Sequence, residues 1–161
     1  MPNPYSPPEA HVTDQPRPPG SPWKAIGWGL LVDIGGTMVL GTVFAIVAGV
    51  VMAAQGYPVE EVEAAFSGPV FDSWVSAGAM LLGLGCSVAG GYVGARIVRR
   101  QELKFAAIQA VLANVLGLLL ASGPDAADDR PFVLLAVSFV AVMAGAVWGQ
   151  FRNRGQQGSF S

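Results

Sequence analysis

The sequence consists of long apolar stretches separated by short polar segments. Four stretches, at about residues 26–54, 69–98, 103–121 and 132–151, are dominated by aliphatic residues, alanine and glycine. A helix of about 20 apolar residues crosses the roughly 30 Å of hydrocarbon in a bilayer. The pattern therefore predicts an all-α polytopic membrane protein, an antiparallel bundle of four transmembrane helices over residues 23–151.

The polar segments at the two ends of the chain predict no packed structure. Residues 1–22 hold eight of the twelve prolines and almost no aliphatic side chains. Such a composition favours a disordered, partly polyproline-like leader. Residues 152–161 form a short polar tail without a helical pattern.

The loop between the first two spans predicts one short helix. Pro58 suits a first helical turn, and the glutamates at 60, 61 and 63 suit the positive end of a helix dipole. Three apolar side chains share one face of this segment: Val59, Val62 and Phe66. We therefore expect this helix to lie on the membrane surface.

Basic residues predict the orientation. Eight of the nine lysines and arginines fall on one side of the predicted bundle: Arg17, Lys24, Arg96, Arg99, Arg100, Lys104, Arg152 and Arg154. Only Arg130 falls on the other side. The positive-inside rule then places both termini in the cytoplasm. The basic turn between the second and third spans (Arg96, Arg99, Arg100 and Lys104) is also a candidate contact for anionic lipid headgroups.

Small residues recur at every fourth position in three of the spans. The glycines of these rows are Gly29, Gly41 and Gly49 in the first span, Gly83 and Gly91 in the second, and Gly145 and Gly149 in the fourth. In lipid, small residues let helix backbones approach closely and so drive association. We expect helix packing at these glycines, with the second span in the centre. A second copy of the chain or another membrane protein is a candidate partner.

Three polar side chains are predicted to lie at similar depth. Asp33 follows Lys24 by nine residues, Ser87 precedes Arg96 by nine, and Asn114 follows Lys104 by ten. At the helical rise per residue, each lies roughly 13 to 15 Å from its basic residue. A carboxyl group in lipid is costly unless it is hydrogen-bonded, protonated or hydrated. The spacing therefore predicts a polar layer of Asp33, Ser87 and Asn114.

Composition excludes most enzyme chemistry. Only 12% of the residues are charged, about half the proportion of a soluble domain. The single histidine, His11, lies in the leader, and the single cysteine, Cys86, lies inside an apolar span. No nucleophile with a base, phosphate-binding loop or metal-ligating cluster is evident. We expect a non-enzymatic protein with the lipid bilayer as its surroundings, and with no cofactor, metal or nucleic acid.

Two functions are open at this point. In the first, the protein is a structural or accessory membrane protein, and Asp33 joins helices, with Asn114 as its partner, or reaches water near the inner boundary. In the second, Asp33 binds a proton or a cation in exchange for a substrate. The small multidrug transporters resemble this chain in outline, with four spans and an acidic residue in the first span. The leader, the aspartate and the pronounced basic bias differ from that group.

The end of the second span carries one further pattern. Gly90, Gly91, Tyr92 and Arg96 form the sequence GGYxxxR. In this respect the chain resembles small uncharacterised four-helix bacterial inner-membrane proteins, in which such a pattern closes the second helix. Phe105 and Ala106 stand where those proteins often have a histidine and a glycine. The resemblance implies the same topology in a bacterial inner (plasma) membrane, and it implies no activity.

Overall fold

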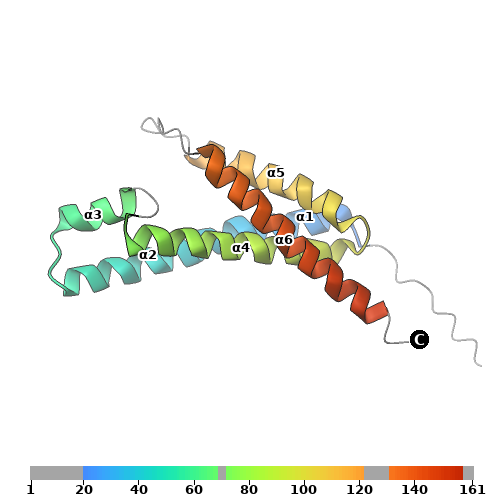
Figure 1. The fold of residues 1–161 in the computed structure, drawn as a ribbon, viewed down its shortest axis with the longest axis horizontal. Helices are drawn as coiled ribbons and strands as arrows, with labels where there is room; N and C mark the ends of the chain where they lie inside the picture. Colours follow the sequence, from blue (N-terminus) through green and yellow to red (C-terminus); the bar gives the residue numbers. More distant parts are fainter. Residues whose placement is uncertain (1–19, 69–71, 122–130, 158–161) are drawn as a thin grey trace, which may run out of the picture.

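The computed structural model describes residues 20–68, 72–121 and 131–157. The predictions for the Pro-rich leader up to residue 19 and for Arg130, on the side opposite the other basic residues, lie outside these ranges. The described residues form helices and short connections, without a strand. Four helices are long and apolar enough to cross a membrane: Pro22–Ala54, Trp74–Val98, Glu102–Leu119 and Phe132–Asn153. The prediction of an all-α membrane protein with four spans is confirmed (Figure 1).

The first span is one continuous helix of three parts. It consists of α1 (Pro22–Leu30), a π-helical turn η1 (Leu31–Gly35) and α2 (Gly36–Ala54). Proline lies at its first position, where the missing N–H costs nothing. The helix ends at Ala54. Gly56 follows it with a φ of 83°, a left-handed conformation that suits glycine because no Cβ clashes there.

The short loop helix forms where the sequence predicted it, as α3 (Val59–Ser67). Its start differs slightly, because Pro58 is extended and precedes the first helical residue. Val62 packs against the buried cluster of Ala48, Met52 and Val75. Val59 and Phe66, predicted to share its apolar face, remain exposed.

The second span, α4 (Trp74–Val98), begins later than the predicted residue 69. Ser73 determines the start, because its Oγ accepts a hydrogen bond from the Ser76 N–H at 3.0 Å. The same hydroxyl lies 2.8 Å from the Ala65 carbonyl oxygen and donates to it, which joins α3 to α4. The cap at Ser73 therefore makes Trp74 the first helical residue, in place of the predicted residue 69.

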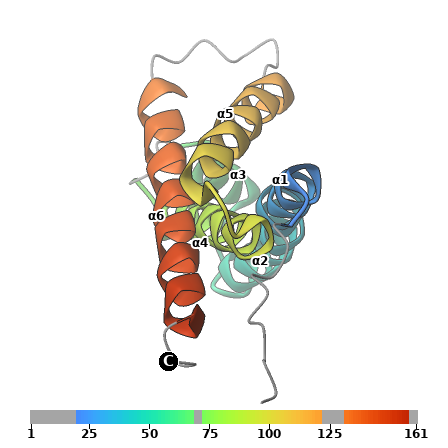
Figure 2. The same cartoon turned by 90° about the vertical axis from the view of Figure 1, so that its right-hand side faces the viewer.

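The second span also lies at the centre, as predicted. It contacts every other helix, and Figure 2 shows α1 and α6 (Pro131–Gln157) on opposite sides of it. Its first turns pack beside the end of α2, and its last turns pack beside α1 and α5 (Glu102–Ala121). In the described chain α2 does not contact α5 or α6, and α2, α3 and the start of α4 extend beyond that pair (Figure 1).

The fourth span continues past its predicted end. We expected a polar tail from residue 152, but α6 remains helical to Gln157. Asn153 explains the extension, because it is tied to the neighbouring helices. Its Nδ2 donates to the Ala95 carbonyl at 3.1 Å and to Glu102 Oε1 at 3.4 Å, while Arg96 Nη1 donates to its Oδ1 at 3.1 Å.

Four of the predicted packing glycines form two contrasting groups. Gly91 and Gly145 lie where α4 and α6 meet: a Cβ at Gly91 would overlap the Val142 carbonyl, and one at Gly145 would overlap the Val88 carbonyl. Gly41 and Gly49 meet nothing within 4 Å in the described chain. The two groups share a residue type and differ in their neighbours. They therefore provide matched test and control positions.

Gly91→Ala and Gly145→Ala should each destabilise the protein by about 1–3 kcal/mol, because the added methyl group meets rigid backbone. Gly41→Ala and Gly49→Ala should leave stability unchanged or raise it slightly, since alanine favours helix and the space is open. Thermal unfolding of the four variants in one detergent measures the contrast. Equal effects in both pairs would contradict the close approach of α4 and α6.

Candidate intramembrane polar site

Asp33 lies inside the π-helical turn that joins α1 to α2. Such turns contain one extra residue, are rare and occur often at functional sites. The Thr37 hydroxyl donates to the Asp33 backbone carbonyl at 2.7 Å, and the same carbonyl accepts from the Gly36 N–H. Only 5% of the Asp33 surface is exposed. The turn therefore places a carboxyl group in the protein interior, within a span.

One carboxyl oxygen of Asp33 has a partner and the other does not. Ser87 on α4 donates its hydroxyl to Oδ1 at 2.8 Å. Oδ2 is buried and has no hydrogen-bond partner among the described residues. Gly90 permits the close approach, because a Cβ there would lie 2.9 Å from the Asp33 Cβ and 2.6 Å from the Gly29 carbonyl oxygen. The sequence thus correctly placed Asp33 and Ser87 at one depth.

Asp33 lines a cavity of about 370 Å³ between η1, α2, α4, α5 and α6. Its polar lining comes from five residues: Asp33, Thr37, Ser87, Asn114 and Ser138. Most of the remaining wall is apolar, with Ile34, Met38, Met80, Leu84, Leu134 and Val137 among its residues. The cavity therefore combines a single charged group with a few hydroxyl and amide groups and an apolar wall.

Asn114 lies at this cavity but does not bond to Asp33. Its Nδ2 donates to the Leu135 carbonyl on α6 at 3.0 Å. The alternative in which Asn114 links the helices through Asp33 is therefore wrong, because Ser87 provides that link. Asn114 instead joins α5 to α6 at the edge of the cavity.

Gln109 is a buried polar residue that the sequence analysis missed. It is 1% exposed, and its Nε2 has no hydrogen-bond partner among the described residues. Its amide fills a notch between helices: a Cβ at Gly29 would overlap it, and one at Gly94 would lie 2.6 Å from its Oε1. The sequence did contain a signal for this residue: Gln109 is a single glutamine within an apolar span. It lies one helical turn before Ala113, and Ala113 lines the cavity. Gln109 was not predicted, because only one polar residue of each helix was compared for depth.

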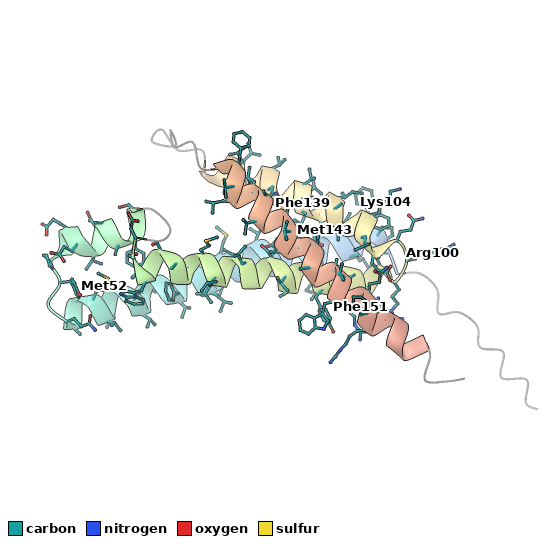
Figure 3. All side chains as sticks on the ribbon, in the orientation of Figure 1. Met52, Arg100, Lys104, Phe139, Met143 and Phe151 are labelled. Atoms are coloured by element: carbon teal, nitrogen blue, oxygen red, sulfur yellow. The ribbon has the colours of Figure 1, made fainter. Side chains whose placement is uncertain are left out.

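The basic turn contains two kinds of residue. Arg99, Arg100 and Lys104 are exposed, and Figure 3 shows Arg100 and Lys104 at the end of the molecule opposite Met52. Arg96 is partly buried and donates to Asn153. Arg99 adopts a left-handed conformation at the end of α4. Arg96 therefore contributes to helix packing, whereas the other three present charge at one end of the bundle.

Among the predicted packing glycines of the first two spans, two lie close to the polar site. Gly29 packs against Gln109, one turn before Asp33. A Cβ at Gly83 would lie 3.9 Å from the Thr37 methyl group, which is ordinary contact, and Gly83 lines the cavity. Small residues thus allow polar side chains to enter the helix contacts at this level.

Comparison with protein families, with curated proteins and with solved structures finds no match for this chain. The GGYxxxR resemblance stays a prediction. The structure gives a local role to each of its residues: Gly90 faces Asp33, Gly91 faces α6, and Arg96 bonds to Asn153. The ring of Tyr92 packs against that of Trp148 at 5.3 Å between centroids. Function therefore has to be argued from the polar site itself.

A double-mutant cycle tests the bond between Asp33 and Ser87. Ser87→Ala should lower stability by about 1–3 kcal/mol, because it leaves a second carboxyl oxygen without a partner. In an Asp33→Asn background the same substitution should cost clearly less, since the acceptor is no longer charged. Unfolding of the four proteins in one detergent gives the coupling energy. Thr42→Val, at an exposed hydroxyl that bonds only within its own helix, is the control. A coupling energy near zero would contradict the bond.

Proposed function

We propose that this protein is a non-enzymatic transporter that binds a proton or a monovalent cation at Asp33 and moves it across the bilayer. The observation that carries the proposal is the buried Asp33 Oδ2, which has no hydrogen-bond partner in the described chain and belongs to a side chain lining a cavity of about 370 Å³. Buried polar atoms in proteins are nearly always hydrogen-bonded, so an unpartnered carboxyl oxygen calls for an explanation. Such an oxygen, on a side chain that lines a cavity, suits a site that exchanges ligands.

The energetics of the bilayer favour an exchangeable positive ligand. An isolated carboxylate in a low-dielectric interior is strongly unfavourable, and either a proton or a cation removes the charge. Ser87 stabilises the ionised form through its hydrogen bond to Oδ1. The two occupants therefore compete for one group, which is the basis of coupled exchange.

The proposal includes a topology. The spans form an antiparallel bundle in a bacterial inner membrane with both termini cytoplasmic, as in the small four-helix proteins that share the GGYxxxR pattern. The charges support it. Arg100 and Lys104 lie at one end of the molecule (Figure 3), and α3, which carries three glutamates, lies toward the other end (Figure 1). α3 then lies on the outer membrane surface, with Val59 and Phe66 toward the lipid.

Cysteine labelling tests this topology. In a Cys86→Ala background, a single cysteine at Glu61 should react with an impermeant maleimide added to intact cells, because the loop helix faces outward. A single cysteine at Arg100 should react only after the membrane is opened. Reaction of the Glu61 cysteine only in opened cells would overturn the orientation.

A structural or accessory role is the second candidate, and the contact between α4 and α6 favours it. At Gly91 and Gly145 two helices approach too closely for any larger residue. In lipid this kind of packing is what holds a bundle together. In this role the bond between Asp33 and Ser87 only fixes the position of α1 against α4. The open surface at Gly41 and Gly49 would receive a second copy or another membrane protein.

Replacement of the carboxyl group distinguishes the two functions. Wild-type proteoliposomes with a pH gradient and an internal pH dye should exchange protons when sodium, potassium or an alkylammonium ion is added outside. Asp33→Asn should abolish the protein-dependent exchange, because a neutral amide binds neither a proton nor a cation. Asp33→Glu should retain part of it. Passive leakage of weak bases is the same in both vesicle preparations, so it is removed when the exchange rate of Asp33→Asn is subtracted from that of wild type.

The Gly41→Ala variant is the matched control, because it changes the same helix where no neighbour lies within 4 Å. Its exchange should equal that of wild type. Equal exchange in wild-type, Asp33→Asn and protein-free vesicles would refute transport. If Asp33→Asn also lowered the melting temperature, the structural role would be the remaining explanation.

A further inference from the structure

We propose that the cavity beside Asp33 selects an organic ammonium ion with at least one N–H group, namely the cation of a primary amine. This inference rests on the proposed function and names the class of its ligand. It follows from which hydrogen-bonding groups around the cavity are already used, from the charge of the lining and from the volume.

Three of the five polar residues of the lining donate a hydrogen bond within the protein. The Ser87 hydroxyl donates to Asp33 Oδ1, and the Thr37 hydroxyl donates to the Asp33 backbone carbonyl. The amide nitrogen of Asn114 donates to the Leu135 carbonyl. Because a carbonyl oxygen only accepts, this last bond also sets which end of the Asn114 amide is the nitrogen.

The charged group that is left over is an acceptor. Asp33 Oδ2 has no hydrogen-bond partner among the described residues, and the oxygens of Ser87 and Thr37 retain lone pairs after their hydrogens are used. The second N–H of Asn114 and the hydroxyl of Ser138 are the remaining donors of the lining. An ionised carboxyl group only accepts, so a ligand that pairs with Asp33 must donate hydrogen bonds.

Charge narrows the class further. Among the described residues, Asp33 is the only charged one that lines the cavity, and no lysine or arginine of these residues lines it. In a low-dielectric site one carboxylate is balanced by one positive charge, so an anion is excluded and a divalent cation is disfavoured. Calcium and magnesium also prefer about six or more oxygen ligands, including several carboxylates or waters. A monovalent cation remains.

The volume of the cavity and its apolar wall indicate that the monovalent cation is organic. The cavity measures about 370 Å³, whereas about 10–15 Å³ in the same measure is enough to hold one water molecule. Most of the wall is apolar, and two flexible methionines, Met38 and Met80, belong to it. An ammonium group on an alkyl chain would place its N–H groups at Asp33 and its carbons against that wall. A quaternary ammonium ion would bring the same charge and would leave the free oxygen without a hydrogen bond.

Two ligands of the same charge and chain length test the inference. Full-length protein in nanodiscs is titrated with n-hexylammonium and with hexyltrimethylammonium, and binding is measured by calorimetry and by the rise in melting temperature. Wild type should bind hexylammonium about tenfold or more tightly than the quaternary ion, because a hydrogen bond to a charged group is worth about 1.5–3 kcal/mol. Empty nanodiscs report partition into lipid.

The variants locate the binding. Asp33→Asn should remove hexylammonium binding, and Asn114→Ala should weaken it while leaving the weaker binding of hexyltrimethylammonium little changed. Gly41→Ala should bind as wild type does. If Asp33→Asn fails to fold, Asp33→Glu replaces it and should keep the preference for the N–H ligand with reduced affinity, because the carboxylate is displaced by one methylene group.

Three results would overturn the inference. Equal affinity for the two ligands, lost in Asp33→Asn, would refute the ligand class and leave the proposed function standing. If neither ligand binds while vesicles still show proton exchange that depends on Asp33, the ligand class is again refuted and the proposed function stands. Failure of binding together with failure of exchange would refute the proposed function as well.

Discussion

The absence of water from the hydrocarbon core is the constraint on which the structure depends. A polar group inside the spans must find its partner within the protein, because lipid offers none. Asp33 meets this demand at one oxygen through Ser87, at 2.8 Å, and its other oxygen has no partner in the described chain, although the side chain lines a cavity. The position of α1 against α4, and the glycine at 90 that permits it, follow from bringing these two side chains together.

Glycine in α4 turns this one helix into the packing centre. A helix with side chains all round keeps its neighbours about 8–10 Å away. With Gly90 and Gly94 facing α1 and Gln109, and Gly91 facing α6, α4 accepts close neighbours on more than one side. The isolated helix would be weakened by so many glycines in water, but in lipid the unsatisfied backbone is the worse alternative. Packing and the polar site therefore share the same residues.

The π-helical turn connects local backbone to chemistry. One extra residue in the turn shifts the face that the following helix presents, so that Asp33 faces inward while most of the long side chains of α2 face outward. The Thr37 hydroxyl stabilises this arrangement from within the same helix. The site is therefore built from a local irregularity held by tertiary contacts.

The sequence by itself determined the class, the four spans and the central place of the second span, because hydrocarbon thickness and the small size of glycine act on composition alone. It also placed Asp33 and Ser87 at one depth. Only the tertiary structure decided that Asn114 bonds to Leu135, that Gln109 fills a glycine notch, and that α6 continues to Gln157. These three features depend on how each helix is rotated about its axis. A small residue at every fourth position does not determine that rotation, which is set by the contacts between neighbouring side chains.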